Sequence, residues 1–229
     1  MEQLIPILES LQQGKIPTGN GHVKVYEKSF TVKETTKLVM VKDGTSKLLL
    51  AAGSGDLFEQ LEGELVGSGK VCPLTHNNRL ILNKYFDYTV PQAFGTKIAT
   101  MGLGDRLGLA SPGHIQTVQG HSIKPILAQQ SIRELNLTNR SMTDILDAAA
   151  FAVFQEGYKG GYGADGDHIK EEKDIEYALD LGISFLTLDC SDQIDNTIES
   201  ASEEDVVTKF DSLPQQTKDY FITHYLDKT

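Results

Sequence analysis

The sequence has 229 residues, and its 32 acidic and 21 basic side chains give a formal net charge of −11. Proteins that bind nucleic acid or an anionic membrane surface need a basic face, so this charge argues against both kinds of partner. Apolar residues make up 39% of the chain, enough for a buried core, yet they form no uninterrupted run of about 18 residues that would predict a membrane span. The N-terminus lacks the basic start and long apolar stretch of a secretory signal, so we expect a cytoplasmic protein.

The first part of the chain, residues 1–95, predicts a small α+β region. Its apolar and β-branched runs are short and separated by turns, as in half-buried strands. An Asp-Gly pair between two such runs is a strong hairpin signal. The predicted strands are His22–Val32, Lys37–Val41 and Ser46–Ala51, and the predicted helices are Leu57–Leu65 and Asn78–Tyr88.

From residue 96 to residue 229 the pattern changes to strand, loop and helix, repeated. Such alternation predicts parallel strands joined by right-handed crossovers. The helix Ser141–Glu156 is the clearest, with Ser141 as its cap and Gly157 as its end. A further helix is expected over Glu171–Leu181. The predicted strands are Lys97–Met101, Pro125–Ala128, Tyr162–Ala164 and Ile183–Leu188.

A polar cluster follows each of these predicted strands. The carboxyl ends of parallel strands share one rim, and active sites of α/β proteins are built there. We therefore expect the clusters to converge on one site. They are Gly102–Arg106, Gln129 and Gln130 with Arg133, Asp165–His168, and Asp189–Asp192.

The first cluster, Gly102–Gly108, has the spacing GxGxxxG. A dinucleotide-binding loop needs GxGxxG and a later acidic residue, so the pattern favours a tight strand-to-helix turn instead. Asp105 and Arg106 in this turn either pair with each other or bind a polar substrate.

The segment Asp165–His168 is the densest chemical cluster of the chain. A calcium loop that starts at Asp165 would place Ile169 at its fifth position and Lys170 where glycine is required, so we reject that interpretation. Imidazole and carboxylate groups suit a transition metal, although one cluster cannot supply a full ligand shell. An Asp-rich turn that caps a helix is the alternative.

Three segments carry a resemblance to a known family. GLGDRLGLASPGHIQ (102–116), AQQSIREL (128–135) and FAVFQEGYKGGYGADGDHIK (151–170) resemble the tagaturonate epimerase family, most strongly across residues 97–192. The resemblance implies a TIM-barrel-like fold, a divalent metal ion as cofactor, and the interconversion of the keto-uronates tagaturonate and fructuronate in hexuronate metabolism.

The resemblance also suggests a role for each polar residue at the strand ends. His168 is expected to be a metal ligand and Asp167 the catalytic base, with opening of a carbon–carbon bond by a retro-aldol step as the hypothesis for the chemistry. The residues expected to contact substrate hydroxyls are Asp105, Gln129, Asp165 and Asp189, and those expected to contact its carboxylate are Arg106, Arg133 and Lys170.

Members of the family are about twice as long as this chain, and a complete barrel typically needs about 250 residues. We therefore expect the first units of an incomplete barrel with little activity alone, which would either associate with itself or need a C-terminal half. A class II aldolase-like sugar-acid lyase and a non-catalytic sugar-acid binding domain remain the alternatives.

Overall fold

The computed structural model describes residues 2–226. Its contacts form two compact units, of which the first ends at Asp189 and the second begins at Cys190. The division near residue 95, which the sequence predicts, lies inside the first unit and stays a prediction. Among residues 2–226, no helix combines the length and apolar character that a membrane crossing requires.

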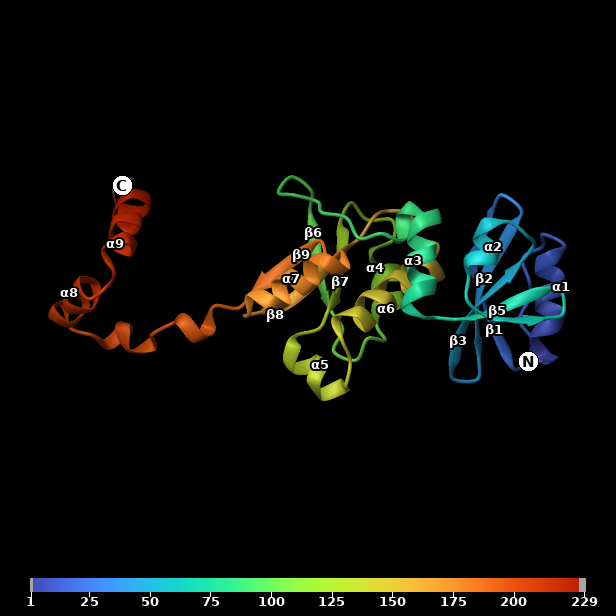
Figure 1. Cartoon of the computed structure of the whole chain (residues 1–229), viewed down its shortest axis with the longest axis horizontal. Helices are drawn as coiled ribbons and strands as arrows, with labels where there is room; N and C mark the ends of the chain where they lie inside the picture. Colours follow the sequence, from blue (N-terminus) through green and yellow to red (C-terminus); the bar gives the residue numbers. More distant parts are fainter. Residues whose placement is uncertain (1, 227–229) are drawn as a thin grey trace. The chain divides into compact units, whose positions relative to one another are not determined.

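An antiparallel sheet forms the N-terminal part of the first unit (Figure 1). Its strand order is β1-β2-β3-β5-β4. Helix α1 packs on one face of this sheet, and α2 and α3 contribute to the core on the other face. The strands are β1 (Val23–Lys33), β2 (Thr36–Asp43), β3 (Ser46–Ala52), β4 (Glu64–Val66) and β5 (Gly69–Pro73), and the helices are α1 (Ile5–Gln12), α2 (Asp56–Gln60) and α3 (His76–Tyr85).

Strand β2 is buried on both faces, which explains its continuous apolar run. Leu38 and Met40 belong to the core under α3, whereas Val39 and Val41 belong to the core under α1. This alternation follows from the two-residue period of a strand. The predicted hairpin between β2 and β3 is confirmed, with Asp43 paired to Ser46.

The predicted helix over Leu57–Leu65 is wrong in its second half. Helix α2 ends at Gln60, and Glu64–Val66 forms the edge strand β4, paired with β5. Gly63 lies so close to β5 that a Cβ atom there would be 2.5 Å from the Val71 carbonyl oxygen. The chain must therefore pass β5 as a strand, and local helical preference is overridden by this pairing.

A parallel sheet in the order β6-β7-β8-β9 forms the rest of the first unit. Helices α4, α5, α6 and α7 contribute to the core of this part, so the predicted fold class, an α/β repeat with parallel strands after a small α+β region, is confirmed. The strands are β6 (Thr100–Gly104), β7 (Lys124–Gln129), β8 (Gly163–Ile169) and β9 (Phe185–Leu188), and the helices are α4 (Ser111–Val118), α5 (Ile132–Thr138), α6 (Met142–Gln155) and α7 (Glu172–Leu181).

Helix α6 connects the cores of the two sheets. Its residues Phe151 and Phe154 pack into the core of the antiparallel sheet, whereas Ala149 and Val153 pack against the parallel sheet. A helix that is apolar over most of its surface is expected to be buried in this way. Its start at the Ser141 cap is confirmed by a reciprocal capping box with Asp144.

We expect Gly157→Ala to lower the free energy of unfolding by about 2 kcal/mol or more. Gly157 has a φ of +57°, and a Cβ atom there would lie 2.3 Å from the Lys28 carbonyl oxygen. Gly182, which ends α7, is the matched control because its φ is +91° and a Cβ atom would meet nothing within 4 Å. Urea denaturation of both variants should show the larger loss for Gly157→Ala, and equal losses would contradict the close contact.

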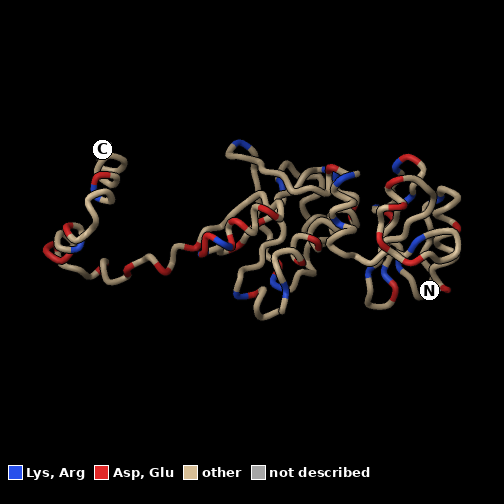
Figure 2. Tube along the Cα trace, in the orientation of Figure 1, with Lys and Arg blue, Asp and Glu red and all other residues tan. Residues whose placement is uncertain are grey.

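The second unit contains the helices α8 (Glu203–Asp211) and α9 (Gln215–Phe221). Ser202 caps α8 through a capping box with Asp205. Acidic residues recur along the segment that leads into α8, as Figure 2 shows. The candidate site lies entirely in the first unit.

Candidate functional site

Strands β6 to β9 pair in parallel, so their carboxyl ends lie along the same edge of the sheet. In parallel α/β proteins this edge carries the functional residues. The sequence predicted convergence of the polar clusters on that basis.

Two of these clusters lie inside strands, whereas the sequence placed them after strands. Gly102–Gly104 belongs to β6 and Asp165–His168 belongs to β8. Glycine and aspartate disfavour strands, which is why the sequence pattern ended both strands early. A Cβ atom at position 102 would lie 2.7 Å from the side-chain amide of Gln129, so a larger residue there would displace this amide.

The backbone is distorted at the ends of β7 and β8. Ala128 has a φ of 62° and His168 a φ of 53°, although neither residue is glycine. The register of β8 on β9 shifts between Gly166 and Ile169, on either side of this distortion. Bulges and strained residues of this kind redirect side chains and cluster at functional sites.

Asp165 is the centre of a polar layer that crosses three strands. Its side chain is 0% exposed, and its Oδ2 atom accepts hydrogen bonds from Gln129 Nε2 at 2.8 Å and Thr187 Oγ1 at 2.9 Å. Within residues 2–226, no hydrogen-bond partner reaches its other oxygen, Oδ1. A buried oxygen without a partner is costly, and contact of Asp165 with the substrate stays a prediction.

Burial raises the pKa of Asp165, while the hydrogen bonds from Gln129 and Thr187 act in the opposite direction. The ionised carboxylate is therefore less favourable in the folded chain than in the unfolded chain. The contribution of Asp165 to the free energy of unfolding is therefore greatest below the ordinary carboxyl pKa of about 3.9. It falls as the pH rises through the higher pKa of the folded chain.

We therefore expect Asp165→Asn to raise the free energy of unfolding at pH 7, with a gain that shrinks as the pH approaches 4. An asparagine oxygen can still accept from Gln129 and Thr187, and the amide carries no charge. Asp180→Asn, on the exposed part of α7, controls for the removal of one negative charge. Urea titrations between pH 4 and 7 provide the measurement, and a pH-independent loss of stability would contradict the effect of burial.

Asp167, His168 and Asp189 lie together beside this layer. His168 Nε2 is 3.7 Å from Asp167 Oδ1, and His168 Nδ1 is 3.7 Å from Asp189 Oδ2. Lys170 Nζ is also 3.7 Å from Asp189 Oδ2. Burial raises the pKa of Asp167, and the negative charge of Asp165 raises it further. A higher pKa makes a carboxylate a stronger base at neutral pH.

The predicted metal site is not formed by these residues alone. No group of three or more His, Cys, Asp or Glu residues within residues 2–226 is arranged to hold a metal ion. Asp167 and Asp189 lie beside different nitrogens of the His168 ring, so the two carboxylates do not converge with the imidazole on one point. His168 as a metal ligand stays a prediction, and its other ligands would come from outside the described residues.

A pocket of about 600 Å³ adjoins His168. It brings together four of the predicted site residues, namely Arg133, His168, Lys170 and Asp189. They come from the first turn of α5, the end of β8, the loop before α7 and the end of β9. His168 as a metal ligand and the other three residues as substrate contacts stay predictions, and all four lie around one pocket.

Asp105 and Arg106 bind other groups of the chain rather than each other, and their predicted contacts with substrate stay predictions. The Asp105 carboxylate accepts hydrogen bonds from the backbone N–H groups of Leu109, Ala110 and Ser111 at 2.8–3.2 Å. This geometry favours a structural role for Asp105 over contact with a sugar. Arg106 pairs through Nε with Glu134 Oε1 at 3.1 Å.

The sequence interpretation missed two residues that support the site, Thr187 and Glu134, and it placed Gln130 in a polar cluster without assigning it a role. Thr187 is recognisable only once β9 is aligned with β8. Glu134 stands three residues after Ser131, and this Ser-x-x-Glu spacing is a capping box that also predicts α5. Gln130 is 2% exposed, and nothing in its local sequence indicates burial.

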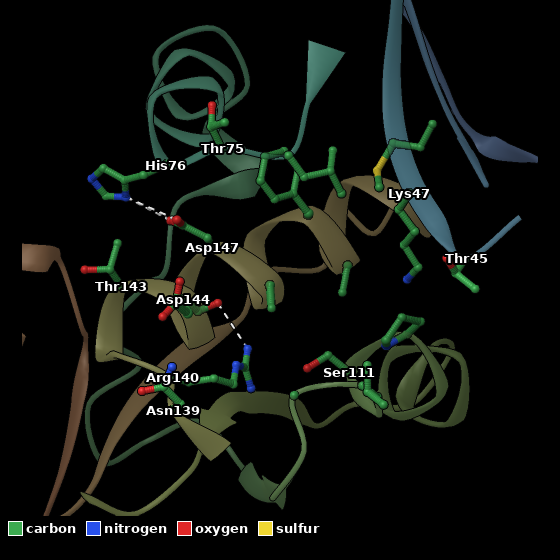
Figure 3. Close-up of a pocket in the computed structure, with 18 residues that line it drawn as sticks. Thr45, Lys47, Thr75, His76, Ser111, Asn139, Arg140, Thr143, Asp144 and Asp147 are labelled. Atoms are coloured by element: carbon green, nitrogen blue, oxygen red, sulfur yellow. Dashed lines mark hydrogen bonds and ion pairs between the residues drawn. The ribbon is translucent and has the colours of Figure 1, made fainter. Parts of the chain in front are cut away.

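A second hollow of about 750 Å³ lies between α6, the start of α3 and the β6–α4 loop (Figure 3). Its main polar groups already pair within the protein. His76 Nδ1 lies 3.0 Å from Asp147 Oδ1, and Arg140 donates to the Asp144 carbonyl oxygen at 3.2 Å. Much of the remaining wall is apolar.

Comparison with known proteins places the chain in a family. The family model described as tagaturonate epimerase, UxaE, matches residues 26–229. The chain belongs to the tagaturonate epimerase family. The resemblance seen in the sequence is therefore confirmed.

Relatives within the tagaturonate epimerase family agree with the fold. The tagaturonate/fructuronate epimerase of Thermotoga maritima is 36% identical over 200 residues, which cover 85% of this chain and 41% of that protein. Two crystal structures of the fructuronate-tagaturonate epimerase UxaE of Cohnella laeviribosi, one native and one with glycerol, match with a TM-score of 0.85 and 52% identity. Each match covers 100% of this chain and 45% of the other. The chain thus spans less than half the length of these epimerases.

Proposed function

We propose that this chain supplies the first β/α units of a metal-dependent epimerase that interconverts tagaturonate and fructuronate. The observation that carries the proposal is the polar cluster at the strand ends, where the buried Asp165 is held by Gln129 and Thr187 and, beside it, Asp167 lies close to the exposed His168. Such an arrangement of carboxylate, amide, hydroxyl and imidazole groups suits a substrate rich in hydroxyl groups.

The chemistry of the substrates limits the mechanism. The two keto-uronates differ in configuration at the carbon β to the ketone, which is separated from the carbonyl carbon by one other carbon. The ketone does not acidify the hydrogen on that carbon, so simple removal and return of this hydrogen is unfavourable. The hydroxyl group there is, however, placed for a retro-aldol cleavage.

In the proposed reaction, Asp167 removes the hydroxyl proton at the carbon to be inverted. The oxygen then forms an aldehyde as the carbon–carbon bond toward the ketone breaks, and the bonding electrons pass to the ketone oxygen to give an enediolate. Rotation of the aldehyde and closure on its other face restore the bond with inverted configuration. Asp167 returns its proton to the new alkoxide, so atoms and electrons balance without an oxidant.

Cations around the pocket would stabilise the negative charges in this sequence. Arg133 and Lys170 line the pocket and can offset the charge that develops on the ketone oxygen. We retain a divalent metal ion as part of the proposal for the complete enzyme, with His168 as one ligand. No step above depends on it, because the described residues do not complete its ligand set.

The proposal is tested with a hybrid that joins this chain to the part of the Cohnella laeviribosi relative that lies beyond the match. We expect the hybrid to convert tagaturonate into fructuronate and the 229-residue chain alone to show little or no turnover. Release of three-carbon fragments would favour the aldolase-like alternative. Binding without turnover by the hybrid would favour a sugar-acid binding domain.

A further inference from the structure

The loop between β6 and α4 is bound to the β7–α5 segment by a buried side chain. The buried side chain of Gln130 donates from Nε2 to the backbone oxygen of Arg106. The same side chain accepts a hydrogen bond from Arg140 at 2.8 Å through its Oε1 atom. The Arg140 guanidinium also fills the space beside Gly108, where a Cβ atom would lie 1.7 Å from one of its nitrogens. Gln130, which is itself bound to Arg140, thus anchors the backbone at Arg106.

The side chain of Arg106 is anchored as well, although it is 81% exposed. Its Nε atom lies 3.1 Å from Glu134 Oε1, and the Glu134 carboxylate is only 19% exposed. The other oxygen of Glu134 accepts from the backbone N–H of Ser131 at 3.1 Å, so Glu134 is itself fixed by the capping box of α5. Holding an exposed arginine side chain in one geometry costs side-chain entropy. At Arg106 this cost is already met before a ligand binds.

This arrangement leaves the far edge of the guanidinium accessible. Because Glu134 is bound through Nε, the edge that carries the two terminal nitrogens can bind a second carboxylate with two parallel hydrogen bonds. Arg106 stands two residues after the end of β6, at the same rim as the pocket that Glu134 lines. Lys170, in contrast, is paired with Asp189.

We propose that Arg106 recognises the carboxylate of the sugar acid, and that Glu134 and Gln130 are positioning residues that hold Arg106 in place for it. This inference rests on the proposed function. In this proposal the cations of the site have different roles. Arg106 selects an acidic sugar over a neutral one, while Arg133 and Lys170 contact the reacting part of the substrate.

The test measures binding of two probes to the 229-residue chain by isothermal titration. One probe is tagaturonate, and the other is the neutral ketose that carries a CH2OH group in place of the carboxylate. We expect the wild-type chain to prefer tagaturonate by about tenfold, as the loss of a charge-assisted bidentate contact suggests. Arg106→Gln should remove this preference and leave binding of the neutral ketose unchanged.

The positioning role is tested with Glu134→Gln. Glutamine can still cap α5 but cannot pair with Arg106, so we expect an unchanged melting temperature and about three- to tenfold weaker binding of tagaturonate only. Glu176→Gln, on the exposed part of α7, is the matched control and should bind both probes as the wild type does. A role of Glu134 in folding alone would lower the melting temperature and leave the preference between the two probes intact.

The outcomes separate this inference from the proposed function. A wild-type preference for tagaturonate that survives Arg106→Gln would overturn the inference and leave the proposed function standing. A preference lost in Arg106→Gln but kept in Glu134→Gln would overturn the positioning role of Glu134. A wild-type chain that binds both probes equally would overturn the recognition of the acid and count against the proposed substrate class.

Discussion

Asp147→Ala should lower the free energy of unfolding by about 3–5 kcal/mol, the usual loss when one partner of a buried ion pair is removed. Asp147 lies on α6 and accepts a hydrogen bond from Arg79 Nε at 2.8 Å. Arg79, on α3, is 3% exposed, and His76 Nδ1 lies 3.0 Å from the same carboxylate oxygen (Figure 3). Without Asp147, the Arg79 charge would stay buried with no carboxylate to offset it.

Asp144→Ala is the matched control, because Asp144 lies on the same helix but is exposed. It should cost about 1 kcal/mol through loss of the capping box. The double variant Arg79→Met with Asp147→Leu should be less destabilised than Asp147→Ala, since two apolar groups need no compensating charge. Chemical denaturation provides all three values, and equal losses for Asp147→Ala and Asp144→Ala would refute the importance of the buried pair.

Asp167→Asn should lower the turnover of the hybrid enzyme by about 10²–10⁴-fold, the usual contribution of a general base. The amide has the shape of the carboxylate but cannot take the hydroxyl proton, so substrate binding should change little. Burial and the charge of Asp165 raise the pKa of Asp167, which makes it a stronger base than an exposed aspartate. Steady-state rates and the KM of the variant separate the two effects.

Asp180→Asn, on the exposed part of α7, is the control for this variant and should leave turnover unchanged. If Asp167→Asn retained activity within about tenfold of the parent, another group would have to be the base. A loss that appears mainly in KM would instead assign Asp167 to substrate binding.

Sequence patterns predicted the parallel sheet because β7 and β9 are short apolar runs and α6 has a clear period, cap and terminal glycine. They ended β6 and β8 too early because Gly102 and Asp165 are unfavourable in isolated strands. In the folded chain both positions contact neighbouring strands. The Gln129 side chain fills the space beside Gly102, and Asp165 accepts a hydrogen bond from Thr187 on β9.

The candidate site was predictable in its location and less so in its details. The carboxyl ends of parallel strands lie at one rim of the sheet regardless of side-chain conformation. The polar clusters at these ends therefore come together, and Asp167, His168 and Asp189 lie close to one another. Individual partners depend on register and on the positive φ of His168, which no local pattern encodes. For the same reason the sequence could not show that Asp105 binds the backbone of its own loop.

The most direct test of the account is to follow the hybrid enzyme acting on tagaturonate in D2O by proton NMR. A retro-aldol route keeps the original hydrogen on the inverted carbon, because that hydrogen stays on the aldehyde carbon throughout. We predict that fructuronate appears with a full proton signal at that position. No fructuronate, or fructuronate that carries deuterium at the inverted carbon, would contradict the account.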